Sequence, residues 1–361
     1  MDIELLQERA GIIRRVRSFF DGREYLELDT PLLSPDLIPE SCLEVFETQR
    51  IGDRRNAAQS PFWLIPSPEI WMKKIIAQHR VSVYQVCKCF RNGESTGFLH
   101  NPEFTMLEYY TMNANYLDSL KLTEDLFEFL TQRHKGTEFS SGSFNSSIKS
   151  SEILGDKVSC APFADNSHSS VPPSLREGDW GKWCFERITV AEAFARYAGF
   201  DLFEAADRPG AMETEARRLG LDPPDGLKTA ELYDLIFIHA VEPRLKQKTP
   251  VALLDYPAFV PCLARRGAGG KTVERWELYW NGIELANCFS EETDPARVRD
   301  FFESEAAAKE HSAVRHAIDR DYWKHFQDFP ACSGVALGLD RLIMALLGRS
   351  TIDSVLPFPM K

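Results

Sequence analysis

The chain has 361 residues, of which 43% are hydrophobic and 27% charged, an ordinary composition for a globular enzyme with a sizeable core. Its formal net charge of −12 argues against a large basic surface for nucleic acid, because such a chain repels phosphate backbones. Its apolar runs are too short and too interrupted by charge for a signal peptide or membrane helix, so we expect a cytoplasmic protein.

The first third of the chain predicts alternating helices and strands. Apolar residues at helical spacing predict a helix over 3–20, ended by Gly22, and a short strand follows over 25–33. Prolines before Glu69 and an acid in the first turn predict a helix beginning there. The further elements predicted in this part are strands over 81–90 and 104–110 and a helix over 117–132.

The rest of the chain begins with a segment rich in Ser, Pro and Gly over about 134–183, which we interpret as an irregular insertion. Helical patterns return over 186–248, and a hairpin is predicted over 276–290, where Asn281-Gly282 is a preferred type I′ turn. The last predicted elements are helical structure over 296–327, a strand after Cys332 and a helix near 341–347. These elements favour an α+β fold, with a mainly antiparallel sheet flanked by helices, over a parallel sheet.

The strand predicted over 104–110 carries the first candidate site. Phe104, Met106, Glu108 and Tyr110 share one face of a strand, which gives an aromatic ring to stack on a base and a carboxylate to hold a cation. Arg91 on the preceding strand could clamp a phosphate through two parallel hydrogen bonds. An amphipathic strand with a surface arginine is the alternative interpretation.

The predicted hairpin carries the second candidate site. A two-residue turn pairs Tyr279 with Glu284 and places Glu277 diagonally across the same face. Two carboxylates this close repel each other unless a cation such as Mg²⁺ lies between them. The alternative is a solvated face with two exposed acids, opposite a core formed by Trp280, Ile283, Leu285 and Phe289. Glu291 has the wrong parity and joins the acidic face only if the strand bulges, near Ala286.

The third candidate site is the segment 333–342, where small residues in a strand permit close approach of a ligand. Arg341 follows in the first turn of a helix, where backbone N–H groups favour anions. The alternative is tight packing of strand against helix, with a surface arginine.

The order of these segments resembles a known family. Segments 91–110, 277–291 and 334–341 resemble motif 2, the acidic hairpin and motif 3 of class II aminoacyl-tRNA synthetases, and 19–31 resembles motif 1, whose proline lies at the dimer interface. The strings SPE, HNPEFTMLEYY, IELANCFSEETD and STIDSVLPFP are similar to the lysine branch of that family.

Within this branch the chain most resembles the ligases that attach β-lysine to elongation factor P. Motif 1 begins near Phe19, which leaves no room for the anticodon-binding domain that precedes it in lysyl-tRNA synthetases. In addition, Ala336 in the segment 334–338 stands where those synthetases have glycine. We therefore expect one catalytic domain over 1–361, interrupted by the insertion at about 134–183.

The resemblance implies a role for each matching residue. It implies catalytic phosphate contacts from Arg91 and Arg341, and Mg²⁺ ligands in Glu277 and Glu284. The other residues implied in ATP binding are Asn92, Glu94, His100, Asn101, Phe104, Leu285 and Gly338, with Glu284 again. Those implied in lysine binding are Ser67, Pro68, Glu69, Glu108, Tyr110, Asn287, Glu291 and Ala336. One departure is Gly93, which displaces the following acid, Glu94, by one position and lengthens the loop to His100.

The function implied is activation of lysine or β-lysine as an adenylate, with ATP and Mg²⁺, and transfer to a lysine of elongation factor P. The resemblance also implies a homodimer without stable tRNA binding or membrane attachment. A truncated lysyl-tRNA synthetase-like enzyme, or a free amino-acid ligase similar to asparagine synthetase A, is the alternative. Glu108 and Glu291 favour a cationic substrate over aspartate. A non-catalytic regulatory relative is disfavoured because Arg91, Glu277, Glu284 and Arg341 are retained.

Overall fold

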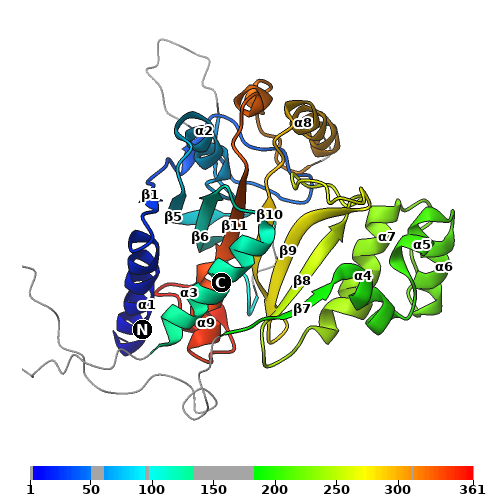
Figure 1. Cartoon of the computed structure of the whole chain (residues 1–361), viewed down its shortest axis with the longest axis horizontal. Coiled ribbons are helices and arrows are strands. Elements are labelled where there is room, and N and C mark those ends of the chain that lie inside the picture. The colour runs from blue at the N-terminus through cyan, green and yellow to red at the C-terminus, as the bar shows by residue number, and fades with distance from the viewer. Residues whose placement is uncertain (1–2, 50–60, 94–96, 133–182, 311, 361) are drawn as a thin grey trace, which may run out of the picture.

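A computed structural model describes residues 3–49, 61–93, 97–132, 183–310 and 312–360. Its centre is an eight-stranded sheet with the order β1-β5-β6-β11-β10-β9-β8-β7 (Figure 1). All neighbours are antiparallel except the outer pairs β1–β5 and β7–β8. The strands are β1 (Leu26–Glu27), β5 (Val83–Phe90), β6 (Glu103–Met112), β7 (Glu186–Thr189), β8 (Val251–Pro257), β9 (Thr272–Trp280), β10 (Ile283–Ser290) and β11 (Cys332–Gly338). The predicted α+β fold is therefore confirmed.

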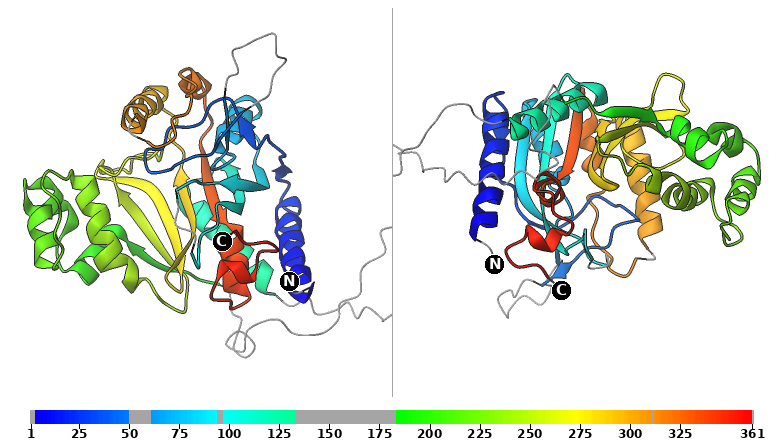
Figure 2. Two further views of the ribbon diagram at one scale, coloured as in Figure 1. Left: turned by 180° about the vertical axis from the view of Figure 1, so that it is seen from behind. Right: turned by 90° about the horizontal axis from the view of Figure 1, so that it is seen from below.

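Three helices cover one face of this sheet, namely α1 (Ile3–Asp21), α3 (Tyr116–Thr131) and α9 (Leu339–Leu346) (Figures 1 and 2). Their apolar faces bury the alternate residues of the strands. Phe20 of α1, for example, stacks on Tyr84 of β5 with ring centroids 4.8 Å apart. Because successive side chains of a strand point to opposite faces, this core leaves the other set of side chains facing away from these helices.

The remaining helices form two further groups. At the β7–β8 end, α4 (Val190–Ala193), α5 (Leu202–Asp207), α6 (Ala211–Arg218) and α7 (Thr229–Ile236) pack around a core of their own (Figure 2). Short π and 3₁₀ turns at Phe194–Ala198, Phe237–Val241 and Glu242–Arg244 continue α4 and α7. At the opposite corner, α2 (Glu69–His79), α8 (Pro295–Lys309) and the 3₁₀ turn η5 (Tyr322–Phe326) pack together. None of the described helices is both long and apolar enough to cross a membrane.

Three predicted elements differ from the structure. The strand expected over 25–33 is divided into β1 and β2 (Leu33–Ser34), because Pro31 between them has no N–H to donate to a ladder. β2 belongs instead to a three-stranded sheet with β4 (Phe62–Leu64) and β3 (Glu47–Thr48). The region 186–248 is helical as predicted except for β7, and β8 was not predicted. The insertion expected at 134–183 lies, apart from its last residue, outside the described residues.

The helical prediction over 296–327 holds only for α8 and η5. The intervening segment is not helical, because its backbone bonds to the loop before β3. Leu37 N donates to Ala317 O at 3.0 Å, and the carboxylate of Glu44 accepts hydrogen bonds from Ala313 N and Val314 N at 3.0 and 3.1 Å. Long-range hydrogen bonds therefore replace helical ones.

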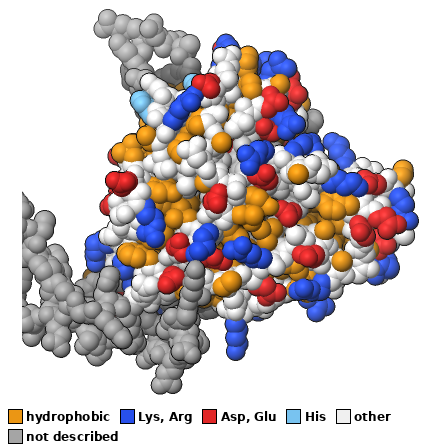
Figure 3. All heavy atoms as spheres, in the orientation of Figure 1, with side chains coloured by type: hydrophobic (Ala, Val, Ile, Leu, Met, Phe, Trp, Pro, Cys, Tyr) orange, Lys and Arg blue, Asp and Glu red, His pale blue; other side chains and the backbone are white. Residues whose placement is uncertain are grey.

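Over the face in Figure 3, acidic and basic side chains are interspersed.

Candidate active site

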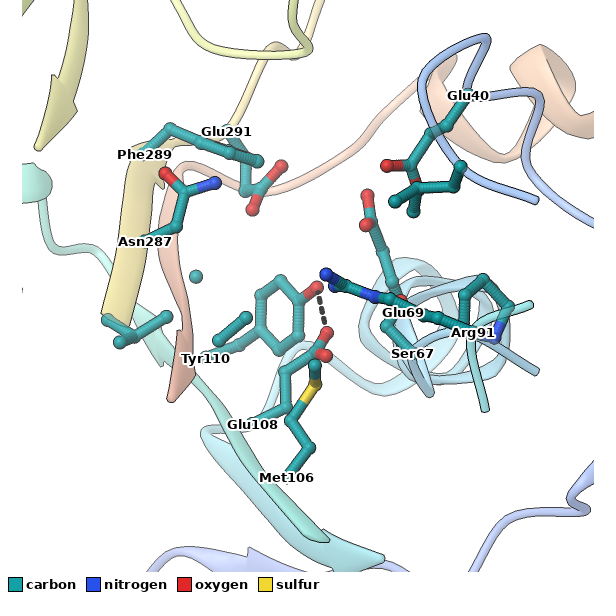
Figure 4. A pocket seen from close by; sticks show the side chains of 15 residues that line it. Glu40, Ser67, Glu69, Arg91, Met106, Glu108, Tyr110, Asn287, Phe289 and Glu291 are labelled. Atoms are coloured by element: carbon teal, nitrogen blue, oxygen red, sulfur yellow. Dashed lines mark hydrogen bonds between the residues drawn. The ribbon is translucent and has the colours of Figure 1, made fainter. Parts of the chain in front are cut away.

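A pocket opens on the sheet face opposite α1, α3 and α9, between the strands β6, β10 and β11 and the start of α2. Figure 4 shows side chains from all these elements converging on it. The lining residues include eight polar or charged ones and a few apolar ones: Glu40, Leu43, Pro66, Ser67, Glu69, Arg91, Met106, Glu108, Tyr110, Asn287, Phe289, Glu291, Gly334, Val335 and Ala336. Seven of the eight residues predicted to bind lysine therefore lie around one cavity. The eighth, Pro68, is the residue before α2.

The register of the sheet explains this convergence. Ala336 of β11 pairs with Glu108 of β6 on one side and with Asn287 of β10 on the other. Residues paired directly across strands point to the same face, so a carboxylate and an amide flank one methyl group. Tyr110 follows Glu108 on that face and pairs with Gly334. The shared face predicted for the strand over 104–110 is thus confirmed.

A bulge in β10 decides which face Glu291 joins. Tyr279 pairs with Glu284 as predicted, but the next pair is Leu278 with Ala286, so Leu285 is the extra residue. This shift by one residue brings Asn287, Phe289 and Glu291 to the pocket face with Glu284. The bulge that Glu291 needs in order to join this face is therefore present. The assignment of Phe289 to the opposite core was wrong, because the same shift moves it into the pocket.

Buried carboxylates dominate the pocket. Tyr110 donates its hydroxyl hydrogen to Glu108 Oε1 at 2.7 Å, whereas Glu108 Oε2 is buried with no hydrogen-bond partner among the described residues. Burial and the charge of Glu69 raise the pKa of Glu108 well above its usual range. Burial also raises the pKa of Glu291 to about 7. Such acids are stabilised in their charged form when a cation enters beside them.

Lys73 of α2 is the main functional residue that sequence reasoning missed. Its side chain is fully buried, with Nζ 2.5 Å from Glu69 Oε1 and 2.6 Å from Glu291 Oε2. A signal was available in the sequence, because Lys73 follows Glu69 by four residues and lies on the helix face of Ile70, Met72 and Ile76, which are buried. A lysine at such a position must find partners inside the protein.

The residues predicted to bind ATP adjoin this pocket through Arg91. Its guanidinium carbon lies 5.3 Å from the ring centroid of Phe104, and Arg91 also lines the pocket. Arg341, in the first turn of α9, donates from Nη1 to Glu284 O at 2.9 Å and from Nε to Leu99 O at 3.3 Å. Gly338 precedes α9, and Leu285 turns its side chain into the core, so only its backbone faces this region.

The two acids predicted to bind Mg²⁺ differ in their surroundings. One carboxylate oxygen of Glu277 accepts hydrogen bonds from the hydroxyl groups of Tyr256 and Tyr279, at 2.5 and 2.7 Å. Its other oxygen lies 2.6 Å from Arg275 Nη2. Glu284 is partly exposed, and its nearest cation is Arg341, 3.9 Å away. Burial and the charge of Glu277 raise the pKa of Glu284 above its usual range.

These surroundings fit a divalent cation bound mainly by Glu284. Among the described residues, the single ion pair of Glu284 is the long contact with Arg341 at 3.9 Å, so its carboxylate oxygens can accept a further cation, and hard oxygen donors are what Mg²⁺ prefers. Glu277 retains one lone-pair direction on the oxygen that faces Arg275. The sequence did not point to Arg275, which also donates from Nε to Asn287 Oδ1 at 3.1 Å and so joins the acidic hairpin to the amino-acid pocket.

Several other predicted residues support the loops around the site. Asn92 donates from Nδ2 to Val45 O at 3.3 Å and accepts from Gly93 N at 2.9 Å, so its amide holds the turn after β5. Asn101 is buried; it donates to Glu103 O and accepts from Met360 N at 2.8 Å. His100 bridges to Gly97 at the end of the same loop. Glu94 lies outside the described residues.

Comparison with known proteins agrees with this geometry. The family described as tRNA synthetases class II (D, K and N) matches residues 3–361. An elongation factor P–(R)-β-lysine ligase of Photobacterium profundum is 30% identical over 368 residues, covering 99% of this chain and 96% of that protein. The enzyme of the same name from Vibrio cholerae is 32% identical over 364 residues, covering 99% and 95%.

A lysine–tRNA ligase of Pelotomaculum thermopropionicum is 31% identical over 363 residues, which are 99% of this chain but 63% of that protein. Both kinds of relative are named as ligases of lysine or β-lysine, and the match to the family extends over the whole sheet and the pocket. The chain therefore belongs to the class II tRNA synthetases and is an ATP-dependent aminoacylating ligase.

Proposed function

We propose that this protein activates lysine or β-lysine as an adenylate and transfers it to a lysine side chain of elongation factor P. The observation that carries the proposal is the cluster of buried acids at one end of the pocket, where Glu108 Oε2 has no hydrogen-bond partner among the described residues. A buried, unpaired carboxylate oxygen is costly unless a ligand satisfies it. The match to the relatives named as elongation factor P ligases covers nearly the whole of this chain and nearly the whole of each relative.

The pocket fits the two ends of a diamino acid. We assign Glu69, with Ser67, to the amino group near the carboxyl end, and Glu108, Tyr110, Asn287 and Glu291 to the distal ammonium. A neutral or acidic side chain would leave these carboxylates buried without a partner, so the pocket discriminates by charge. We place the substrate carboxylate toward Arg91, which also lines the pocket.

In the proposed first step, an oxygen of the substrate carboxylate attacks the α-phosphorus of ATP, and the bond to the β-phosphate breaks. The products are the aminoacyl adenylate and pyrophosphate. Arg91 and Arg341 hold the phosphates in line and oppose the charge that develops on them. Mg²⁺ held by Glu284, with Glu277 behind it, would supply further charge neutralisation on the phosphates. Stacking on Phe104 orients the adenine.

In the second step, the acceptor amine attacks the adenylate carbonyl carbon, an amide bond forms and AMP leaves with the bonding electrons. The nitrogen loses a proton in the process. Neither step requires the protein to form a covalent bond to the substrate, so positioning and charge account for the proposed catalysis.

We expect the protein to aminoacylate elongation factor P and to charge tRNA poorly, because a formal net charge of −12 opposes binding of a phosphate backbone. The measurement is transfer of labelled lysine, (R)-β-lysine and (S)-β-lysine from ATP-containing reactions to elongation factor P or to lysine tRNA. A variant of elongation factor P with the acceptor lysine replaced by arginine is the control. Efficient charging of tRNA without transfer to the protein would instead favour a lysine–tRNA ligase function.

We also propose that the protein is a homodimer and that its edge strand β1 contributes to the interface. Leu26 lies in this edge strand and is 53% exposed, and Val81, two residues before the adjacent strand β5, is 38% exposed. Apolar side chains beside an open sheet edge favour coverage by another chain. A second copy of this protein is the occupant that the resemblance to motif 1 supports.

Ala336→Gly should increase the use of α-lysine relative to β-lysine. The methyl group of Ala336 lies between Glu108 and Asn287 on the pocket floor, where it crowds an amino group on the α-carbon more than one on the β-carbon. One methyl group in a pocket changes selectivity by about 1–3 kcal/mol. Pyrophosphate exchange with both isomers measures the ratio of kcat/KM values, and an unchanged ratio would show that Ala336 only fills space.

A further inference from the structure

Lys73 lies buried behind two acids that line the pocket, and the proposed chemistry does not explain its position. Its ammonium group contacts Glu69 Oε1 at 2.5 Å and Glu291 Oε2 at 2.6 Å, and it lies 5.7 Å from the ring centroid of Phe289. The side chains of Lys73 and Glu291 are 0% and 1% exposed. The structure therefore already holds one ammonium group between an acid assigned to one end of the substrate and an acid assigned to the other.

We infer that Lys73 is a positioning residue that holds Glu69 and Glu291 in place, and thereby sets how many positive charges the substrate must bring. The inference rests on the proposed function for the identity of that substrate. Four carboxyl groups line the pocket, those of Glu40, Glu69, Glu108 and Glu291, together with the guanidinium group of Arg91, and Lys73 contacts two of these acids from behind the lining. The acids outnumber these two cations by two, and a diamino acid supplies two ammonium groups, whereas a monoamino acid leaves one carboxyl group without a counter-ion.

The surroundings of Lys73 support this role because the groups that face it are acids or neutral groups. The titratable groups around its ammonium, from four elements and two loops, are Glu40, Glu69, Glu108, Glu291, Tyr322 and Cys332. Although burial opposes the charge, Glu291 and Glu69 raise the pKa of Lys73 well above its usual value. Lys73 thus stays charged over the whole range in which Glu291, with a pKa of about 7, titrates.

The first test measures stability and does not depend on activity. Lys73→Met keeps the apolar stem but removes the charge that lowers the pKa of Glu291, so the carboxyl group of Glu291 retains its proton to higher pH in the folded protein. The folded state then binds more protons than the unfolded state, and stability falls as pH rises. We expect the deficit in Tm relative to wild type to widen by several degrees between pH 5 and pH 8.

Two variants make this test specific. Lys74→Met removes the neighbouring lysine of α2, which pairs with Asp319 at 3.0 Å outside the pocket, and its deficit should not change with pH in this way. Lys73→Met with Glu291→Gln removes both members of a buried pair, so it should recover part of the Tm lost at pH 8. If Lys73→Met alone does not fold, recovery of a folded protein by adding Glu291→Gln provides the same evidence.

The second test measures lysine-dependent pyrophosphate exchange as a function of pH. At a pH below the pKa of an essential carboxyl group, each unit by which that pKa rises lowers the ionised fraction of the group about tenfold. Lys73→Met should therefore raise KM for lysine at least about tenfold at pH 7, with the deficit narrowing toward pH 9. KM for ATP should change less than threefold, because Lys73 is not among the residues assigned to the nucleotide.

The outcomes separate this inference from the proposed function. The inference would be overturned by a folded Lys73→Met protein whose Tm deficit relative to wild type is the same at every pH and whose KM for lysine depends on pH as it does in the wild type. A loss of activity that is equal at every pH would also overturn it, since that is the result of a merely structural role. A wild-type protein without lysine-dependent exchange, but with the expected Tm profiles, would count against the proposed function and would still support the role of Lys73 in ionisation.

Discussion

Gly334→Ala should reduce lysine-dependent pyrophosphate exchange by at least about a hundredfold while leaving ATP binding almost unchanged. A Cβ atom at this position would lie 2.5 Å from Glu291 Oε1 and 2.8 Å from Tyr110 Cδ1, and closer still to Cε1 of that ring. Gly334 does not have a positive φ angle, so the backbone accepts alanine and the effect is purely steric. Contacts this short must be relieved by movement of the neighbouring groups.

Neither neighbour can move without loss of a pocket interaction. Tyr110 donates its hydroxyl hydrogen to Glu108 at 2.7 Å, and Glu291 is held by Lys73 at 2.6 Å. The methyl group therefore displaces the acids that we assign to the distal ammonium. Overpacking of this kind costs about 1–3 kcal/mol of stability, which is small enough to leave the variant folded at room temperature.

Gly269→Ala is the matched control for this experiment. A Cβ atom there would meet nothing within 4 Å, and φ at Gly269 is also not positive. We expect its exchange rate and its Tm to equal those of the wild type. If Gly334→Ala kept the wild-type KM for lysine, the pocket between β6, β10 and β11 would not be the amino-acid site.

Glu284→Gln should reduce exchange by about a hundredfold or more through loss of the Mg²⁺–nucleotide contact. The change preserves shape and removes one charge at the position where pyrophosphate leaves. It should not lower the stability of the free protein near pH 8. There the ionised Glu284 is repelled by Glu277, and its contact with Arg341 is long, at 3.9 Å, and partly exposed, so a neutral amide relieves repulsion and loses only a weak pair.

The combination of lost activity with retained Tm distinguishes a metal-binding role from a structural one. Exchange should be measured over a range of Mg²⁺ concentrations, because loss of a ligand predicts a higher requirement for the metal. Glu274→Gln on the adjacent strand β9 is the control; Glu274 pairs with Arg265 at 2.6 Å, a partly exposed contact of small expected energy. Wild-type exchange and metal dependence in Glu284→Gln would refute the role assigned to this acid.

The sequence by itself was sufficient for the elements and motifs with strong local signals. The Asn281-Gly282 turn has the positive φ angles of 54° and 79° that a type I′ turn requires, so the register of the hairpin near the turn followed from two residues. Side chains alternate between the two faces of a strand because its geometry fixes a period of two, so the sequence alone placed Met106, Glu108 and Tyr110 on one face. The order of the motifs indicated the family that the comparisons confirmed.

Only the tertiary structure decided how the charges of the pocket are arranged. Lys73 follows Glu69 by one helical turn, a spacing that is also common for surface pairs. In the structure, α2 packs with this face inward. The bulge at Leu285 brings Glu291 to the same ammonium group. Arg275 likewise becomes the partner of Glu277 only when β9 and β10 are paired. Burial and long-range pairing set the ionisation of these groups, and neither is encoded in the spacing of neighbouring residues.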